Sequence, residues 1–185
     1  MEDFRSENCQ KAFISERSKV QKKIAKATFD EKEDIAIDMF NDVCLRASKN
    51  DCIAQDYLAY VFKKGLINVV PVNYTKYMQW EILAAANGNQ FAIDKLSLFL
   101  NYALNEIMFA EDFGFIVKRN NLTQENYVYV VGRLLCEAIA DELFLDAEKL
   151  VKDPLIFEDF NARSMRVFDR ARNFVIPKVL KFLRN

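Results

Sequence analysis

The sequence predicts an all-α protein, and three observations support this prediction. Glycine and proline are scarce, with 4 and 3 residues in a chain of 185, whereas average proteins contain roughly 7% and 5%. Good helix formers such as alanine, leucine, lysine and glutamate occur throughout the chain. Apolar residues recur every three or four positions in several segments, which is the spacing of one face of an α-helix.

Two helices are predicted at the start of the chain. Residues 6–26 mix charged and apolar positions, which predicts an amphipathic N-terminal helix within a segment that spans residues 1–29. A second helix is expected from Asp30 to about Asn50, because apolar residues recur there at intervals of four. It opens with a cluster of acidic side chains, which stabilise the positive end of a helix dipole.

Three further helices are predicted before residue 110. Gly65 and Gly88 follow the first two of them and are expected to end them as C-caps. Pro71 excludes a helix from the loop between those two. The three helices cover residues 53–64, 76–86 and 91–110, and the last carries the apolar residues Leu96, Phe99, Leu100, Ala103, Leu104 and Ile107.

The helical pattern breaks around Gly114 and resumes at residues 121–123, where polar side chains can cap a helix. From there the spacing predicts one long helix that reaches about Lys152. Pro154 ends it, because proline interrupts the hydrogen bonds of a helix interior. A last helix is expected after this break, with a kink or a restart at Pro177.

Composition and charge exclude several kinds of function. The net charge is −1 and no apolar run approaches the ~20 residues that span a bilayer, so we expect neither a nucleic-acid partner nor a membrane. The sequence has no histidine, which removes Ser-His-Asp and Cys-His catalysis and histidine-containing zinc sites. The N-terminal residues lack the apolar segment of a signal peptide. Four scattered cysteines predict reduced thiols in a cytoplasmic protein.

Residues 54–89 combine large and small side chains at regular spacing. Bulky residues precede a run of alanines that ends in an Asn-Gly-Asn sequence. Small residues let two helices approach to about 8 Å, and a glycine permits the sharp turn that follows. The residues that carry this packing pattern are Ala54, Leu58, Phe62, Gly65, Trp80, Ala84, Ala85 and Gly88.

This pattern resembles the Sel-one-like repeat, a tetratricopeptide-related family of α/α helical hairpins. One repeat is matched at about residues 54–89, with weaker half-repeats on either side. Ala59 stands where the family has a glycine. The resemblance implies a short helical-repeat solenoid over residues 30–110, with residues 111–185 as a helical extension packed on it.

The resemblance also implies a protein-protein interaction or adaptor role. Such repeats stack into a curved array whose concave face binds a partner protein. We expect the contacts on the inner face of the first helices, at Tyr57, Tyr60, Val61 and Lys64. The two tyrosines are three positions apart, and both cannot be buried unless their hydroxyl groups find partners.

Two acidic regions suggest an alternative function, that of a small immunity or antitoxin protein that neutralises a toxin. Asp34, Asp38 and Asp42 form one stripe, which is either a solvated face or a site for a cation or a basic partner. Residues 137–148 form the second region. We expect the first stripe to be a solvated face.

Neither acidic region predicts an enzyme. Glycosidases place two carboxylates across a cleft, whereas Glu137 and Asp141 lie on one helix. Di-metal helical bundles add histidines, which this chain lacks. Burial should raise the pKa of the Cys136 thiol and leave it inert. We therefore expect no catalytic residue, no cofactor and no metal site.

The C-terminal residues 161–185 are basic and apolar. Their arginines Arg163, Arg166 and Arg170 suit either a phosphate backbone or a membrane surface. The alternative is a packed helix whose arginines pair with the acidic residues 137–148. We expect this packed helix, because the two regions have opposite charge and the whole chain is nearly neutral.

Overall fold

The computed structural model describes residues 11, 15, 18, 19, 22, 23, 29–66, 68–152 and 173–185. Within these ranges lie the labelled helices α2 (Phe29–Ser48), α3 (Cys52–Lys64), α4 (Tyr74–Ala86), α5 (Gln90–Met108), α6 (Phe113–Arg119), α7 (Tyr127–Glu142) and α8 (Ala147–Lys152). Residues 173–184 form one more helix, called here the C-terminal helix. The described residues contain no β-strand, only an isolated bridge between Leu66 and Val70. The prediction of an all-α protein is therefore confirmed.

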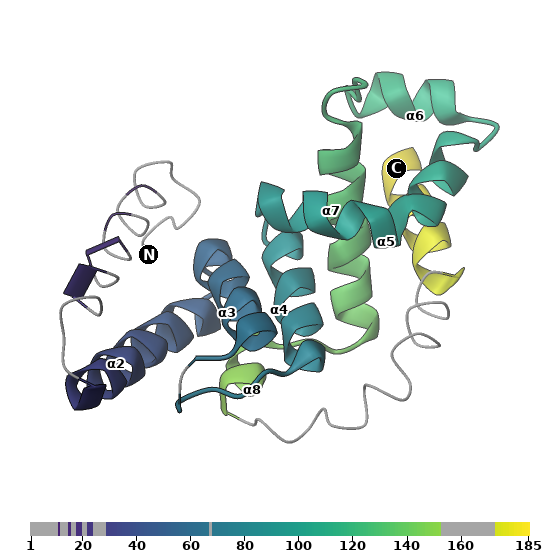
Figure 1. Cartoon of the computed structure of the whole chain (residues 1–185). Coiled ribbons are helices and arrows are strands. Elements are labelled where there is room, and N and C mark those ends of the chain that lie inside the picture. Colours follow the sequence, from purple (N-terminus) through teal and green to yellow (C-terminus); the bar gives the residue numbers. More distant parts are fainter. Residues whose placement is uncertain are drawn as a thin grey trace.

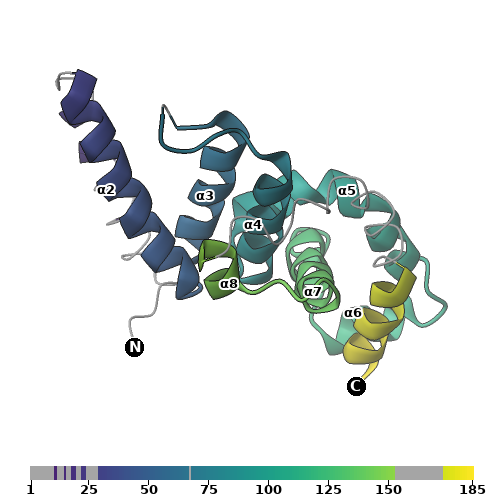
Figure 2. The same cartoon turned by 90° about the horizontal axis from the view of Figure 1, so that it is seen from below.

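The first four labelled helices are neighbours in chain order, and the rest of the chain folds back on them. α2 packs on α3, α3 on α4 and α4 on α5. α7 then packs on both α4 and α5, and Figure 1 shows α5 crossing in front of it. α8 returns to contact α2, near the C-terminal end of α2 in Figure 2. Residues 30–110 and the described part of 111–185 thus share one core.

Side-chain caps decide where three of these helices begin. Asp51, Asn73 and Asn89 precede α3, α4 and α5, and each accepts a hydrogen bond from a backbone N–H two or three positions ahead, at 3.0–3.3 Å. Such caps satisfy N–H groups that the first turn of a helix leaves unpaired. Arg46 holds the buried Asp51 carboxylate through an ion pair of 2.7 Å.

A residue with a left-handed backbone closes four of the described helices. These residues are Asn50 after α2 (φ 62°), Gly88 after α4 (φ 90°), Asn121 after α6 (φ 51°) and Phe144 after α7 (φ 52°). In each case the residue that follows donates its backbone N–H to the carbonyl of the residue five positions before itself, at 2.9–3.3 Å. This arrangement satisfies the last carbonyls of a helix and reverses the chain.

The α3–α4 hairpin is held by the small residues that the sequence places in it. Ala54, Ala84 and Ala85 are fully buried, as is Leu58, and Trp80 is 1% exposed. Phe62 is half-buried against the same core and meets the ring of Phe40 edge-on, with ring centroids 6.3 Å apart. Gly65 ends α3 with a φ of 76°.

Two predicted elements in the C-terminal part were wrong. Residues 113–119 form the short helix α6, where only a break around Gly114 was expected. The long helix predicted to reach Lys152 ends at Glu142, and α8 begins five residues later, at Ala147. The reversal at Phe144 allows α8 to return to the core, where its Leu150 side chain is buried and its Leu150 carbonyl accepts a hydrogen bond from Lys76 Nζ at 2.7 Å.

The C-terminal helix continues through Pro177 without a restart. Its residues Val175, Val179 and Leu183 are buried at spacing four, so its apolar side packs on the core. The predicted N-terminal helix lies almost wholly outside the described residues, and so do Arg163, Arg166 and Arg170. Among the described helices, none is both long enough and apolar enough to cross a bilayer.

Candidate functional site

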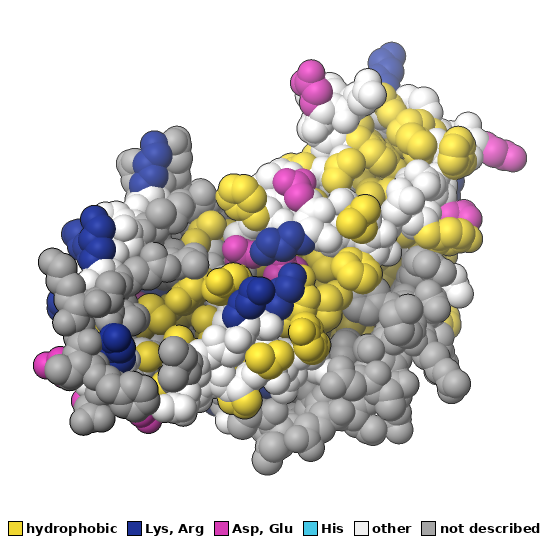
Figure 3. Space-filling model, in the orientation of Figure 1, with side chains coloured by type: hydrophobic (Ala, Val, Ile, Leu, Met, Phe, Trp, Pro, Cys, Tyr) yellow, Lys and Arg dark blue, Asp and Glu magenta, His cyan; other side chains and the backbone are white. Residues whose placement is uncertain are grey.

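Helix α5 is apolar on two sides. Its inner side is buried in the core through Ala92, Ile93, Leu96, Leu100, Ala103, Leu104 and Ile107. Its outer side carries a second apolar row, called here the α5 stripe, made of Phe91 (71% exposed), Leu98 (85%), Phe99 (56%), Tyr102 (50%) and Phe109 (78%). Figure 3 shows hydrophobic side chains spread over this part of the surface. A helix that only packed on the core would have a polar outer side.

The α5 stripe is large for a free protein surface. A large aromatic side chain offers roughly 150–250 Å², so at these exposed fractions the five residues together present roughly 600 Å² of apolar surface to solvent. The largest apolar patch on a typical monomer is about 300–600 Å² and is often functional. Phe115 of the neighbouring helix α6 is also 55% exposed.

Helix α5 is rigidly placed in the fold. Asn89 caps its first turn and also donates a hydrogen bond from Nδ2 to the carbonyl of Cys52 at 3.2 Å. Tyr127 of α7 donates its hydroxyl to the carbonyl of Leu104 at 2.5 Å, and burial raises the pKa of Tyr127 to about 12. Gly132 of α7 lies so close to Ile93 that a Cβ there would come within 3.1 Å of Cγ2. The stripe is therefore presented on a fixed helix.

An ion-pair network borders the stripe. Lys95 of α5 places its Nζ 2.5 Å from Asp56 Oδ1 of α3 and 2.8 Å from Glu81 Oε1 of α4. Burial raises the pKa of Glu81, and the hydrogen bond and charge of Lys95 offset this only in part. Burial lowers the pKa of Lys95, but its bonds to Asp56 and Glu81 outweigh this effect, so the pKa is raised overall. One lysine thus joins three helices.

The buried polar groups of α4 do not form a reaction centre. The Glu81 side chain is 0% exposed, so no substrate can reach it. The side chain of Gln79 and Trp80 Nε1 are buried and make no hydrogen bond to the described part of the chain. These groups line neither the cavity beside the end of α5 nor the one between α7 and the C-terminal helix.

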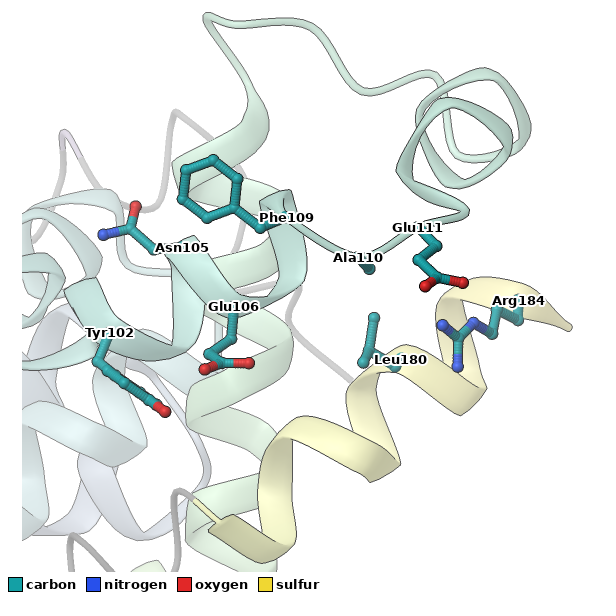
Figure 4. Close-up of a pocket in the computed structure, with 8 residues that line it drawn as sticks. All are labelled: Tyr102, Asn105, Glu106, Phe109, Ala110, Glu111, Leu180 and Arg184. Carbon is teal, nitrogen blue, oxygen red and sulfur yellow. The ribbon is translucent and has the colours of Figure 1, made fainter.

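A cavity of about 580 Å³ lies between the end of α5 and the C-terminal helix. Figure 4 shows the residues that line it, which are Tyr102, Asn105, Glu106, Phe109, Ala110, Glu111, Leu180 and Arg184. Arg184 is already engaged by two hydrogen bonds to Asp112, at 2.5 and 2.7 Å, and these bonds lower the pKa of Asp112. The stripe residues Tyr102 and Phe109 line this cavity. The cavity therefore continues the α5 stripe and is not a separate charged site.

The acidic region at residues 137–148 is largely paired within the chain. Glu137 binds Arg133 of the same helix at 2.9 Å, and Glu142 binds Lys178 of the C-terminal helix at 2.6 Å. Glu148 pairs with a lysine one turn later in α8. Asp34, Asp38 and Asp42 are all exposed on α2.

The described residues contain no group of three side chains that could hold a metal ion. Cys44, Cys52 and Cys136 are not joined in disulfides. Burial raises the pKa of Cys44 to about 11, and it raises the pKa of the fully buried Cys136 further, so neither thiol is a nucleophile at neutral pH.

The four residues expected to contact a partner divide into two buried and two exposed side chains. Tyr57 and Val61 are buried, at 8% and 3% exposure, and Tyr57 donates its hydroxyl to Met39 Sδ at 3.6 Å. Tyr60 is 50% exposed and stacks on Tyr57, and Lys64 is exposed. Tyr60 and Lys64 alone of these four can touch a partner without a rearrangement of the core.

Sequence reasoning did not single out the α5 stripe. The available signal was that apolar residues occupy two opposite sides of residues 91–110, which is the pattern of a helix with two covered faces. Comparisons of the chain with protein-family models, with curated proteins and with solved structures found no match.

Proposed function

We propose that this chain is a non-catalytic protein-protein interaction module that binds its partner through the α5 stripe. The single observation that carries this proposal is the second apolar side of α5, which faces solvent. Exposed aromatic side chains on a fixed helix are typical of protein interfaces, since they bury much area and lose little conformational entropy.

The absence of histidine and the raised pKa values of the Cys44 and Cys136 thiols agree with a function that needs no catalytic group. Among the described residues, Asp51 beside Arg46 and Glu81 beside Lys95 are carboxylates with strongly buried side chains. Asp51 caps α3, and solvent does not reach Glu81. The interaction proposal therefore accounts for the exposed surface without requiring a reaction.

The proposal includes a repeat architecture similar to the Sel-one-like family for α2–α5. Two helix junctions support it, because the chain turns in the same way after α2 and after α4. The N–H groups of Asn50 and Gly88 each donate to an alanine carbonyl three positions earlier, at 3.1 and 3.0 Å. Each left-handed residue is followed by a side chain, Asp51 or Asn89, that caps the next helix.

Affinity capture from the native host with the full chain as bait tests the proposal. We expect a partner protein to be recovered with the original chain and with Leu45→Asp, a control on an exposed apolar residue of α2. Leu98→Asp and Phe109→Asp should abolish recovery, because a charge in the stripe cannot be buried without a counter-ion. Equal recovery with these two variants, or recovery of no protein at all, would contradict the proposal.

A second candidate function is neutralisation of a basic toxin through the exposed Asp34, Asp38 and Asp42 on α2. Binding through this surface should weaken steeply between about 50 and 500 mM salt, because surface charges are screened. Binding through the α5 stripe should persist over the same range, since apolar burial does not depend on screening. A salt series of the capture experiment separates the two candidates.

A further inference from the structure

Four of the five residues of the α5 stripe are placed symmetrically about its middle. Phe91 and Phe109 stand at its two ends, and Leu98 and Tyr102 lie at equal distances on either side of Leu100. We propose that the stripe binds a second copy of this chain, with the two α5 helices antiparallel and a twofold axis near Leu100. This inference rests on the proposed function and identifies the partner of the same surface.

A twofold axis brings each half of the stripe onto the other half of its copy. In such an interface residue i of one chain meets residue j of the other, and j meets i. Phe91 would then lie against Phe109 of the second copy, and Leu98 against Tyr102. The antiparallel orientation also places the positive end of each helix dipole beside the negative end of the other.

The charges beside the stripe are complementary in this arrangement. Lys95 and Glu106 lie on the same flank of α5, because they are three helical turns apart. In an antiparallel pair the same flank of each helix meets, so Lys95 of one copy faces Glu106 of the other. A lysine ammonium has three N–H donors. Lys95 donates one to Asp56 and forms an ion pair with Glu81, which leaves a donor for this contact.

The opposite flank is equally self-complementary. It carries Asp94, Asn101 and Asn105. Because the same flank of each helix meets in the antiparallel pair, Asp94 lies near Asn105 of the second copy. The amide N–H groups of Asn105 can donate to the Asp94 carboxylate there. Among the residues of α5 itself, no pair of like charges meets on either flank.

The area of the stripe suits a weak dimer. Standard interfaces bury about 800 Å² per partner, whereas the five stripe residues expose roughly 600 Å². The residues on the two flanks supply the remainder. We expect a dissociation constant of about 1–100 µM, because interfaces of this area reach higher affinity only with well-packed anchors and complementary charges.

Sedimentation velocity of the full chain between about 1 and 500 µM tests the inference over the expected range. The original chain and Leu45→Asp should pass from monomer to dimer as concentration rises. Leu98→Asp, at a site that is 85% exposed, should keep its circular dichroism spectrum and raise the dissociation constant at least about 100-fold. Glu106→Lys should raise it about tenfold, because two lysines then face each other.

Photo-crosslinking tests the orientation. The benzophenone analogue of phenylalanine is placed at Phe91, and this chain is mixed with ¹⁵N-labelled unmodified chain. We expect crosslinks between the light and heavy chains at or next to Phe109. Crosslinks to the region of Phe91 in the other chain would contradict the antiparallel arrangement.

The outcomes separate this inference from the proposed function. A chain that stays monomeric at every concentration overturns the dimer, while loss of a captured partner with Leu98→Asp would still support the interaction module. A dimer whose dissociation constant is unchanged by Leu98→Asp uses another surface and also overturns the inference. A monomer whose captured proteins do not depend on Leu98 contradicts both.

Discussion

Adding a Cβ at Gly88 and removing the side chain of Phe144 should change the stability of the fold in opposite directions. Gly88 and Phe144 both close a helix with a left-handed backbone, at φ values of 90° and 52°. The two proposed variants are Gly88→Ala and Phe144→Gly. Asn121→Gly is the matched control, because asparagine already tolerates the left-handed region at its φ of 51°.

The magnitude follows from the backbone and from the space around each residue. A left-handed backbone costs roughly 1–2 kcal/mol for an ordinary residue. Alanine offsets about 0.4–1 kcal/mol of this cost, because it has fewer conformations than glycine in the unfolded chain. A Cβ at Gly88 would meet Tyr129 Oη at 3.5 Å, which is ordinary contact and adds no clash. Gly88→Ala should therefore destabilise the chain by about 1 kcal/mol.

Phe144→Gly reverses the same balance. The Phe144 side chain is 85% exposed, so its removal gives up little burial. We expect the variant to be more stable by about 0.5–1 kcal/mol. The control Asn121→Gly should change the free energy of unfolding by only a few tenths of a kcal/mol.

Urea unfolding followed by circular dichroism measures all three variants, with unchanged m-values as the sign that the transitions are comparable. In thermal unfolding about 1 kcal/mol should shift Tm by about 2–4 °C in a chain of this size. If Phe144→Gly destabilises the chain as much as Gly88→Ala does, the backbone explanation is refuted and the Phe144 side chain must contribute packing.

Three other predictions concern the core and its titrating groups. Leu58→Ala, at a fully buried site, should lower the free energy of unfolding by about 2–5 kcal/mol in urea, and a loss below about 1 kcal/mol would contradict its place in the core. Because burial raises the pKa of Glu81, this residue favours the folded state below its unfolded pKa of 4.5 and loses that contribution as pH rises through its folded pKa. Glu81→Gln should therefore gain stability relative to the original chain as pH rises from about 4 to about 7, measured by urea unfolding at each pH. A difference in unfolding free energy that stays constant over this range would show that Lys95 fully offsets the effect of burial on Glu81. At about pH 8 iodoacetamide should leave Cys44 and Cys136 unmodified in the folded chain, since burial raises the pKa of both thiols, and mass spectrometry should find both alkylated in urea.

Much of the helical organisation could be predicted from local signals. The end of α3 at Gly65 and of α4 near Gly88 follows from the conformational freedom of glycine, which acts within a single turn. The end of α7 could not be predicted in this way. Phe144 adopts the left-handed backbone there without being glycine or asparagine, so no residue type announced the turn.

The candidate site depended on information that residues 91–110 do not contain by themselves. Five of the six apolar residues that the sequence analysis names in this helix are buried, whereas Phe99 is 56% exposed. Tyr57 and Val61, expected to contact a partner, are instead covered by the core. Apolar character alone does not tell which of two apolar faces a neighbouring helix will cover.

By itself the sequence determined the helical class, the positions of most helix ends and the exclusion of histidine-dependent chemistry, because these depend on residue type and on contacts within one or two turns. The tertiary structure alone decided that Glu81 is enclosed beside Lys95 and that the α5 stripe faces solvent. These features arise where α3, α4, α5 and α7 meet, and burial is settled by contacts between segments far apart in the chain.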